Sequence, residues 1–219
     1  LNAINTLNKN FDLNITNYVT FNWAAVAIGI NDLGGVEVDV PESMMEDQML
    51  NGYTTLTAEA TGIDSQLTYQ AGPQTLDGVQ AVAYCRIRYI AGDDYGRTSR
   101  QREVVEKVLE KAKKADIGTL NKIVNDVFPN VATNLGLTDI LAMVPKVGSY
   151  YLGDEGGFPS EDMRGNATIN GGAMVVPVTL VDTAKALHEF LYGNDNYVPS
   201  PTVERISAVI ESDSGLSGN

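Results

Sequence analysis

Within the first forty residues, the spacing of hydrophobic positions changes between that of a helix and that of a strand. Apolar residues at helical spacing predict a helix over residues 1–10, and aromatic and β-branched residues predict a strand over 18–21. Asn22 is suited to cap a helix over residues 23–33. Residues 36–40 alternate strictly, as in a strand with one buried face. A strand, a helix and a strand in close succession favour an α/β fold with packed layers.

The next segment is less periodic. Residues 42–72 are polar and predict a surface loop, after which Asp77 is suited to cap a helix over residues 79–84. Residues 85–89 predict an extended segment, and glycine and aspartate at 91–94 predict a turn.

The second half predicts a mainly helical region. Residues 99–115 form the clearest helical pattern, with one apolar face that includes Val104 and Val108 as expected core, and Gly118 is expected to close the helix. Further elements are expected as helices over 120–128, 137–144 and 182–191, a loop over 153–172 and an edge strand over 173–177.

The chain is expected to form a single domain. Its 219 residues, 43% of them hydrophobic, are sufficient for one core. Residues 1–118 would form the α/β part, residues 119–211 the C-terminal helices and edge strand, and residues 212–219 a mobile tail.

Composition excludes several classes of site. A net charge of −13 disfavours binding to nucleic acid, because such proteins usually present a basic surface. Cys85 and His188 are the only cysteine and the only histidine, so neither an internal disulfide nor a metal site built from several such residues is possible. We expect His188 to be structural, Cys85 to be a small buried hydrophobic residue and Trp23 to lie in the core.

Basic residues concentrate in one segment of this acidic chain. Five of the seven arginines lie within residues 86–102, which hold only two acidic residues. The planar guanidinium group binds phosphate oxygens in pairs and stays charged. The five are Arg86, Arg88, Arg97, Arg100 and Arg102.

The spacing of four of these arginines suggests an anion site. Arg86 and Arg88 would share one face of an extended segment. Arg97 and Arg100 would flank the junction of a loop and a helix, where free backbone N–H groups favour anions. A return of the chain at residues 90–95 would bring both pairs around a diphosphate. The alternative is a set of weak surface ion pairs with the 28 acidic residues of the chain.

Several motifs in the same region resemble the LytR–CpsA–Psr family. Residues 86–88 match its Arg-x-Arg, residues 94–97 its Asp-aromatic-Gly-Arg, and residues 100–101 its Arg-Gln. Upstream, residues 33–41 resemble the strand after its Leu-Gly-Gly turn, and residues 76–84 the helix that leads to the arginines. The resemblance extends over about the first 115 residues.

The resemblance implies a fold and an activity. It implies an α/β/α sandwich with a central mixed β-sheet, here the C-terminal portion of the domain without its N-terminal strands. It implies a phosphotransferase that attaches polyprenyl-pyrophosphate-linked glycopolymers, of the teichoic acid or capsular polysaccharide type, to peptidoglycan in Gram-positive cell-wall assembly. Such a protein is extracytoplasmic and anchored to the cell membrane. This sequence shows no signal peptide and no apolar run near the ~20 residues that span a bilayer, so an anchor would lie outside it.

The resemblance also implies roles for individual residues. Arg97 and Asp94 would be catalytic, with Asp94 orienting an arginine or approaching Mg²⁺. The family's metal-binding Asp and its Ile-Pro-Arg-Asp-type motif are not found in this sequence. Mg²⁺ is therefore expected for the complete domain, with ligands upstream of Leu1. The pyrophosphate would be bound by Arg86, Arg88, Arg97, Arg100 and Gln101.

Two alternative functions remain open at this stage. The first is a module that binds a polyprenyl phosphate or an anionic glycan without turnover, which the missing upstream acidic residues favour. The second is a transcriptional regulator, which the net charge of −13 and the lack of a helix-turn-helix pattern disfavour.

Overall fold

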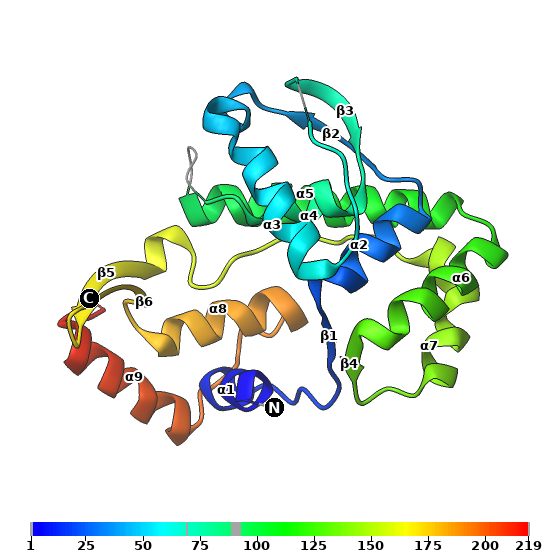
Figure 1. The fold of residues 1–219 in the computed structure, drawn as a ribbon. Helices are drawn as coiled ribbons and strands as arrows, with labels where there is room; N and C mark the ends of the chain where they lie inside the picture. The colour runs from blue at the N-terminus through cyan, green and yellow to red at the C-terminus, as the bar shows by residue number, and fades with distance from the viewer. Residues whose placement is uncertain (1, 69, 89–92, 219) are drawn as a thin grey trace. The chain divides into compact units, whose positions relative to one another are not determined.

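The computed structural model describes residues 2–68, 70–88 and 93–218, and of residues 93–95 only the backbone. The chain divides into two compact units (Figure 1). The central unit is Asn17–Leu152, and the terminal unit combines Leu1–Thr16 with Gly153–Asn219. These boundaries differ from the expected division near residue 118, and the single-domain organisation stays a prediction.

The central unit combines six helices and four strands within the described residues. Its strands pair as two antiparallel two-stranded sheets, β1 with β4 and β2 with β3. The strands are β1 (Val19–Phe21), β2 (Val36–Val40), β3 (Gly72–Leu76) and β4 (Val131–Thr133). The helices are α2 (Trp23–Asp32), α3 (Met49–Thr61), α4 (Gly78–Arg86), α5 (Asp93–Lys114), α6 (Ile117–Val127) and α7 (Leu137–Met143).

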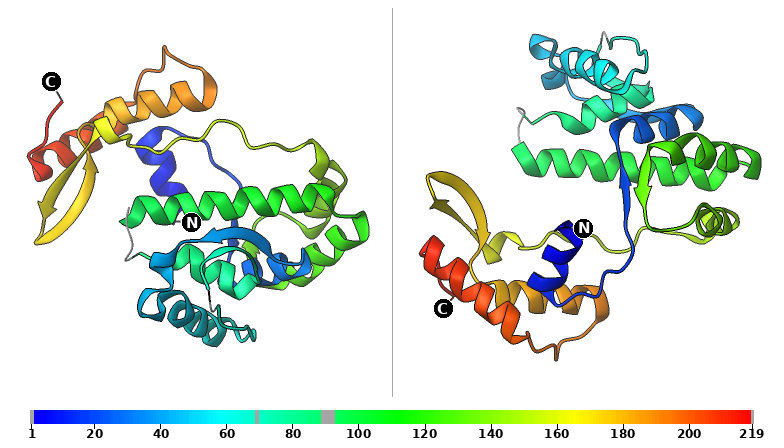
Figure 2. Two further views of the ribbon diagram at one scale, coloured as in Figure 1. Left: turned by 90° about the horizontal axis from the view of Figure 1, so that it is seen from above. Right: turned by 60° about the horizontal axis from the view of Figure 1, so that its bottom comes forward.

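Helix α4 forms the centre of this unit. Every residue from Gly78 to Tyr84 is buried, and α4 contacts α2, α3 and α5. Asp77 accepts a hydrogen bond from the Gln80 backbone N–H at 2.9 Å, and the Gln80 side chain accepts one from the Asp77 N–H at 2.8 Å. This reciprocal pair satisfies two amides at the helix start, so the predicted cap is confirmed. The views in Figure 2 show α5 passing alongside α4.

Strand β2 follows the alternation that predicted it. Val36, Val38 and Val40 are buried, whereas Glu37 and Asp39 between them are exposed. The buried side chains pack in one cluster with residues of α2, α3, β3, α4 and α5. Val104 is buried in the same cluster and Val108 packs against it, as the helical pattern predicted.

Residues 42–72 were wrongly predicted to form a surface loop. They contain α3 and two 3₁₀ turns, and β3 begins at Gly72. The buried face of α3 is largely polar, with Thr54 and Thr57 almost fully buried. Their hydroxyl groups donate to the carbonyl oxygens of Leu50 and Tyr53 at 2.9 and 2.7 Å. Because each buried hydroxyl is satisfied within the helix, α3 packs inward without an apolar stripe.

The extended segment expected over 85–89 and the turn expected over 91–94 were wrong at the residues that the structure places in helices. Cys85 and Arg86 continue α4, and Asp93 already belongs to α5, while residues 89–92 lie outside the described residues. Gly118 lies inside α6 rather than at the end of a helix. The α/β class is confirmed, but the strands in the described ranges form separate antiparallel pairs instead of the expected central mixed sheet.

The described residues of the terminal unit form a β-hairpin, three α-helices and a short 3₁₀ turn. Strands β5 (Arg164–Ile169) and β6 (Gly172–Pro177) pair antiparallel, so part of the expected loop over 153–172 is a strand. The apolar core of the unit includes Leu180, Ala184 and Val203. Residues 212–214, expected in a mobile tail, continue the last helix. The helices are α1 (Asn2–Phe11), α8 (Leu180–Tyr192) and α9 (Pro201–Ser214).

Asp12 joins the N-terminal segment to the C-terminal helices. Its carboxylate accepts hydrogen bonds from the Tyr197 hydroxyl at 2.6 Å and from the Ser200 backbone N–H and hydroxyl at 2.8 and 2.7 Å. The buried His188 ring stacks on Tyr197 with 3.6 Å between centroids, and its Nε2 donates to the Phe11 carbonyl oxygen at 2.7 Å. His188 therefore has the structural role that the sequence predicted.

This cluster predicts a loss of stability in acid. Burial alone would raise the pKa of Asp12, but the hydrogen bonds from Tyr197 and Ser200 outweigh it and lower the pKa from its ordinary 3.8. A carboxyl whose pKa falls on folding stabilises the fold above its unfolded pKa and loses this effect as pH falls through its folded pKa. We expect Asp12→Asn to cost roughly 1 kcal/mol at pH 7.

The measurement is thermal unfolding of wild type and Asp12→Asn between pH 7 and pH 2. The difference in Tm should shrink below pH 3.8 and vanish where Asp12 is protonated in both states. A difference that stays constant across this range would contradict the assignment.

Across the described residues, no helix combines the length and the apolar character needed to cross a lipid bilayer.

Candidate functional site

Arg86 is the last residue of α4 and is held by side chains from two other helices. Its guanidinium lies 3.6 Å from the ring centroid of Trp23 on α2 and 5.7 Å from that of Tyr53 on α3. One amino group donates to the Thr57 hydroxyl at 2.7 Å. The cation also suits the negative end of the α4 dipole. Partial burial lowers the pKa of Arg86, but the guanidinium stays protonated at neutral pH.

Trp23 was wrongly expected in the core, because 46% of its surface is exposed. The buried residues of α2 are Ala25, Ala27 and Ile30, and Trp23 at the first position lies outside that face. It provides instead an aromatic surface on which Arg86 stacks, an arrangement favoured by the negative charge of the ring face. The sequence contains no local signal for this pairing, because the two residues lie far apart in the chain.

Arg100 and Gln101 connect α5 to the C-terminal end of α4. Arg100 is only 8% exposed, and it donates to the carbonyl oxygens of Tyr84, at 3.2 Å, and Ile87. The Gln101 amide donates to the Cys85 carbonyl oxygen at 3.4 Å. The last carbonyls of a helix lack partners within it, so these contacts satisfy groups that would otherwise be unpaired. Desolvation lowers the pKa of Arg100, and the charge of Arg97 adds to this effect.

The structure changes how the arginines come together. Arg97 and Arg100 lie within one helix rather than across a junction, and Arg86 is helical rather than paired with Arg88 on a strand. Arg88 is exposed and Arg97 is partly buried. The contacts between α4 and α5 nevertheless bring the two arginine-bearing segments side by side. The arrangement of both pairs around a diphosphate stays a prediction. The side chain of Asp94 lies outside the described residues.

Two reactive side chains beside the arginines are held in their neutral forms. Burial raises the pKa of the Cys85 thiol to about 12. Burial also raises the pKa of Tyr84, whose hydroxyl donates to Glu103 at 2.8 Å. A protonated thiol is a poor nucleophile, so Cys85 is not suited to covalent catalysis at neutral pH.

The acidic residues do not provide a Mg²⁺ site in the part of the chain that the structure describes. Within residues 2–68, 70–88 and 96–218, no group of three or more Asp, Glu, His or Cys side chains is arranged to hold a metal ion. At the α4–α5 contact the side chains that form hydrogen bonds between the helices include one carboxylate, that of Glu103, together with Arg100 and Gln101. The described donor set therefore does not fit Mg²⁺, which prefers several oxygen ligands.

An apolar pocket lies against the other half of α5. Its volume is about 280 Å³, and its lining comes from α2, α5, α6, α7 and the 3₁₀ turn that follows α7. The lining is almost entirely hydrocarbon and includes Leu33, Val108, Leu120, Ile140 and Met143. A pocket of this kind suits a hydrocarbon chain rather than a polar group.

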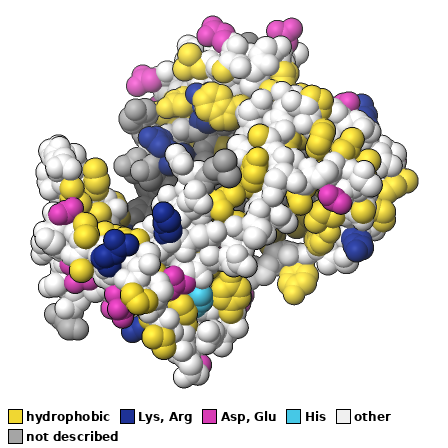
Figure 3. Space-filling model, turned by 90° about the horizontal axis from the view of Figure 1, so that it is seen from below, with side chains coloured by type: hydrophobic (Ala, Val, Ile, Leu, Met, Phe, Trp, Pro, Cys, Tyr) yellow, Lys and Arg dark blue, Asp and Glu magenta, His cyan; other side chains and the backbone are white. Residues whose placement is uncertain are grey.

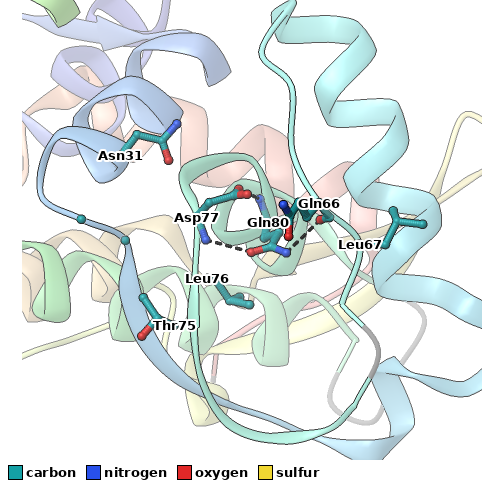
Figure 4. Close-up of a pocket in the computed structure, with 9 residues that line it drawn as sticks. Asn31, Gln66, Leu67, Thr75, Leu76, Asp77 and Gln80 are labelled. Atoms are coloured by element: carbon teal, nitrogen blue, oxygen red, sulfur yellow. Dashed lines mark hydrogen bonds between the residues drawn. The ribbon is translucent and has the colours of Figure 1, made fainter.

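A second pocket, of about 360 Å³, lies at the opposite end of α4 from Arg86. Figure 4 shows Asp77 and Gln80 directed toward each other in it, with the Gln80 amide donating to the Gln66 carbonyl oxygen at 2.9 Å. The Asn31 side chain accepts a hydrogen bond from the Gly78 N–H at 2.7 Å. These polar groups hold the start of α4, so the pocket is explained by the fold.

Comparisons with known proteins identify relatives of the chain. Residues 2–178 match the sequence model of the LytR_cpsA_psr family. A polyisoprenyl-teichoic acid–peptidoglycan teichoic acid transferase, TagU of Enterococcus faecalis, is 27% identical over 172 residues, which are 78% of this chain and 50% of the relative. Biofilm regulatory protein A of Streptococcus mutans is 32% identical over 154 residues, which are 68% of this chain and 34% of the relative. The chain thus spans half or less of each relative.

A solved structure resembles the whole chain. A crystal structure of an Enterococcus faecalis protein, described as a transcriptional regulator, superposes with a TM-score of 0.68 and 26% identity, covering 99% of this chain and 74% of that one. The similarity supports the α/β class, and the family match includes the whole central unit with its arginines. Because the matched residues make up most of the sequence, the chain belongs to the LytR_cpsA_psr family.

Proposed function

We propose that this chain binds the pyrophosphate and the adjoining lipid of a polyprenyl-linked glycopolymer, and that the complete protein transfers the glycopolymer to peptidoglycan. The observation that carries the proposal is one face of α5. At 100° per residue, the positions of Arg97, Arg100 and Gln101 continue into those of Val104 and Val108. Arg100 and Val108, which lines the apolar pocket, lie about 12 Å apart along the helix.

The two ends of this face, separated by the buried Val104, suit an amphiphilic ligand with a diphosphate at one end and a hydrocarbon at the other. Guanidinium groups at the start of α5 and the end of α4 would neutralise phosphate oxygens. The apolar pocket would take the first isoprene units. The names of the teichoic acid transferases among the relatives describe a ligand of this type, a polyisoprenyl-linked polymer.

The proposed transfer is a substitution at phosphorus. An acceptor hydroxyl on peptidoglycan attacks the phosphorus that carries the glycan, and the bond from that phosphorus to the bridging oxygen breaks. Polyprenyl phosphate leaves and formally carries the hydroxyl proton. Arg86, Arg88, Arg97 and Arg100 would lower the barrier by stabilising charge on the oxygens, with Arg97 and Asp94 as the proposed catalytic residues. Mg²⁺ stays a proposal for the complete domain, because the described residues contain no group of three or more acidic, histidine or cysteine side chains that could hold it.

The proposal includes partners and a location. Peptidoglycan lies outside the cytoplasmic membrane, so the reaction would be extracytoplasmic, and a membrane anchor is proposed for the full-length protein. The net charge of −13 makes nucleic acid an unsuitable partner. Binding without turnover is the second candidate function, because the arginines and the apolar pocket account for binding alone.

Calorimetric titration with farnesyl pyrophosphate tests the proposal. We expect saturable binding that persists in EDTA, because the cationic contacts are supplied by arginine. Arg97→Ala should weaken binding by about 1.5–3 kcal/mol, the loss expected when a charge-assisted hydrogen bond is removed.

Arg102→Ala is the matched control. Arg102 is exposed on the same helix, about 140° around the axis from Arg97, so its loss should change the affinity little. Equal affinities for wild type and Arg97→Ala would remove the site assignment. A separate assay distinguishes the enzyme from the binding module. Transfer of a lipid-linked glycan to peptidoglycan in vitro would show an enzyme, whereas binding without transfer would show a binding module.

A further inference from the structure

Two neighbouring aromatic side chains, one of which contacts Arg86, are exposed to solvent. Phe21 ends β1 and is 54% exposed, and Trp23 begins α2. They flank a hollow of about 260 Å³, which is also lined by Asn22, Ala24 and Ala60. Hydrophobic side chains reach the surface beside Lys and Arg side chains elsewhere too, as the face in Figure 3 shows. This hollow differs because one of its aromatic rings contacts an arginine of the proposed pyrophosphate site.

The rings are held in place before any ligand binds. The guanidinium of Arg86 covers part of the Trp23 indole at 3.6 Å. Asn22, between the two aromatic residues, caps α2 by accepting a hydrogen bond from the Ala25 N–H at 2.7 Å. Its amide donates to the Asn130 side chain at 3.2 Å, and Phe21 pairs with Val131 in the β1–β4 ladder. A surface fixed in this way loses little conformational entropy on binding.

The position of the hollow limits what it can bind. A diphosphate held by Arg86 has a hydrocarbon on one side and a sugar on the other. The hydrocarbon is suited to the pocket at α5, whose lining is almost entirely apolar, whereas this hollow is lined in part by the polar Asn22. One face of a pyranose ring presents C–H groups that pack on the negative face of an aromatic ring, while its hydroxyl groups stay in water.

We propose that Phe21 and Trp23 form a subsite for the pyranose ring attached to the pyrophosphate. The inference rests on the proposed function, because Arg86 must hold that pyrophosphate. The subsite makes the identity of the first sugar a determinant of donor affinity.

The test compares two donors that differ only in the sugar. Farnesyl-pyrophosphoryl-N-acetylglucosamine carries the ring, and P¹-farnesyl-P²-methyl diphosphate replaces it with a methyl group at the same charge. In wild type we expect the sugar to tighten binding by about two- to twelvefold, the range of one stacked ring. Trp23→Ala should bring the ratio of the two affinities, with sugar to without sugar, close to one. If Trp23 only positioned Arg86, the substitution would weaken both ligands equally and leave the ratio unchanged, which would overturn the inference.

Further variants separate the remaining outcomes. Phe21→Ala should reduce the ratio without removing the ring under Arg86, which keeps the test valid if Trp23→Ala fails to fold. Tyr151→Ala removes an aromatic residue that is 82% exposed outside the hollow and should leave the ratio unchanged. Since Trp23 is the only tryptophan, its fluorescence should respond more strongly to the sugar-bearing ligand. Failure of both ligands to bind would overturn the proposed function, and the inference with it.

Discussion

Replacing Gly78 with alanine is expected to lower the free energy of unfolding by about 3 kcal/mol or more, as in overpacked cores. A Cβ atom at this position would lie 1.9 Å from the carbonyl oxygen of Ala27 and 2.6 Å from its Cα and carbonyl carbon. These are backbone atoms of α2, so no side-chain rotation relieves the clash. The Gly78 N–H also donates to Asn31 at the same contact. Either α4 moves away from α2 or the buried contact is lost.

Gly52→Ala is the matched control for Gly78→Ala. Gly52 is exposed within α3. Apart from its two chain neighbours and the nearby backbone of α3 itself, no described heavy atom lies within 4 Å of a Cβ atom placed there. Alanine forms helix better than glycine by about 1 kcal/mol, so this variant should be slightly more stable than wild type. Urea unfolding followed by circular dichroism measures both. Equal stabilities of the two variants would show that the α2–α4 contact adapts to a methyl group.

The Gly78 contact also bears on ligand binding. Arg86 is carried by α4 and Trp23 by α2, so a shift between these helices moves the guanidinium relative to the indole. We therefore expect Gly78→Ala to weaken farnesyl pyrophosphate binding even where most of the protein remains folded.

Arg100→Ala is expected to cost roughly 3 kcal/mol of unfolding free energy, from one lost charge-assisted bond and the carbonyls left unsatisfied. The buried guanidinium is bonded to the carbonyl oxygens of Tyr84 and Ile87, at the end of α4. Alanine supplies no donor, and water has little access beside the fully buried Ile87. The measurement is again urea unfolding.

Two variants test why Arg100 matters. Arg102→Ala removes the same side chain from an exposed position on α5 and should change stability by less than about 0.5 kcal/mol. Arg100→Lys keeps the charge but not the planar arrangement of donors, so it should restore only part of the stability. If Arg100→Ala were as stable as Arg102→Ala, the hydrogen bonds from Arg100 to the end of α4 would not contribute to the stability of the fold.

Local rules predicted the parts of the fold that depend on neighbouring residues. Asn22 and Asp77 cap helices because each bonds an amide within its own first turn. The valines of β2 alternate because a strand has two faces. Helix α3 was not predicted because its buried face carries threonines and therefore shows no apolar periodicity. These threonines can be buried because their hydroxyl groups bond the backbone of the same helix.

In the candidate site, too, features set by neighbouring residues could be predicted and features set by packing between helices could not. The arginines were recognisable from residue type and spacing. Their partners were not, because Trp23, Tyr53 and Thr57 reach Arg86 only through the packing of α2 and α3 on α4. The expected geometry also failed at Arg97 and Arg100, since α5 begins earlier than its apolar pattern suggests.

The terminal unit has a consequence for the order in which the chain acquires structure during translation. Asp12 bonds Ser200, 188 residues later in the sequence, so this part of the molecule is completed only after Ser200 has left the ribosome. The central unit is continuous and has its own core, so it can collapse while the ribosome is still adding residues. Once formed, it holds its two ends as a folded body rather than a flexible loop, which reduces the entropy that closing the terminal unit must overcome.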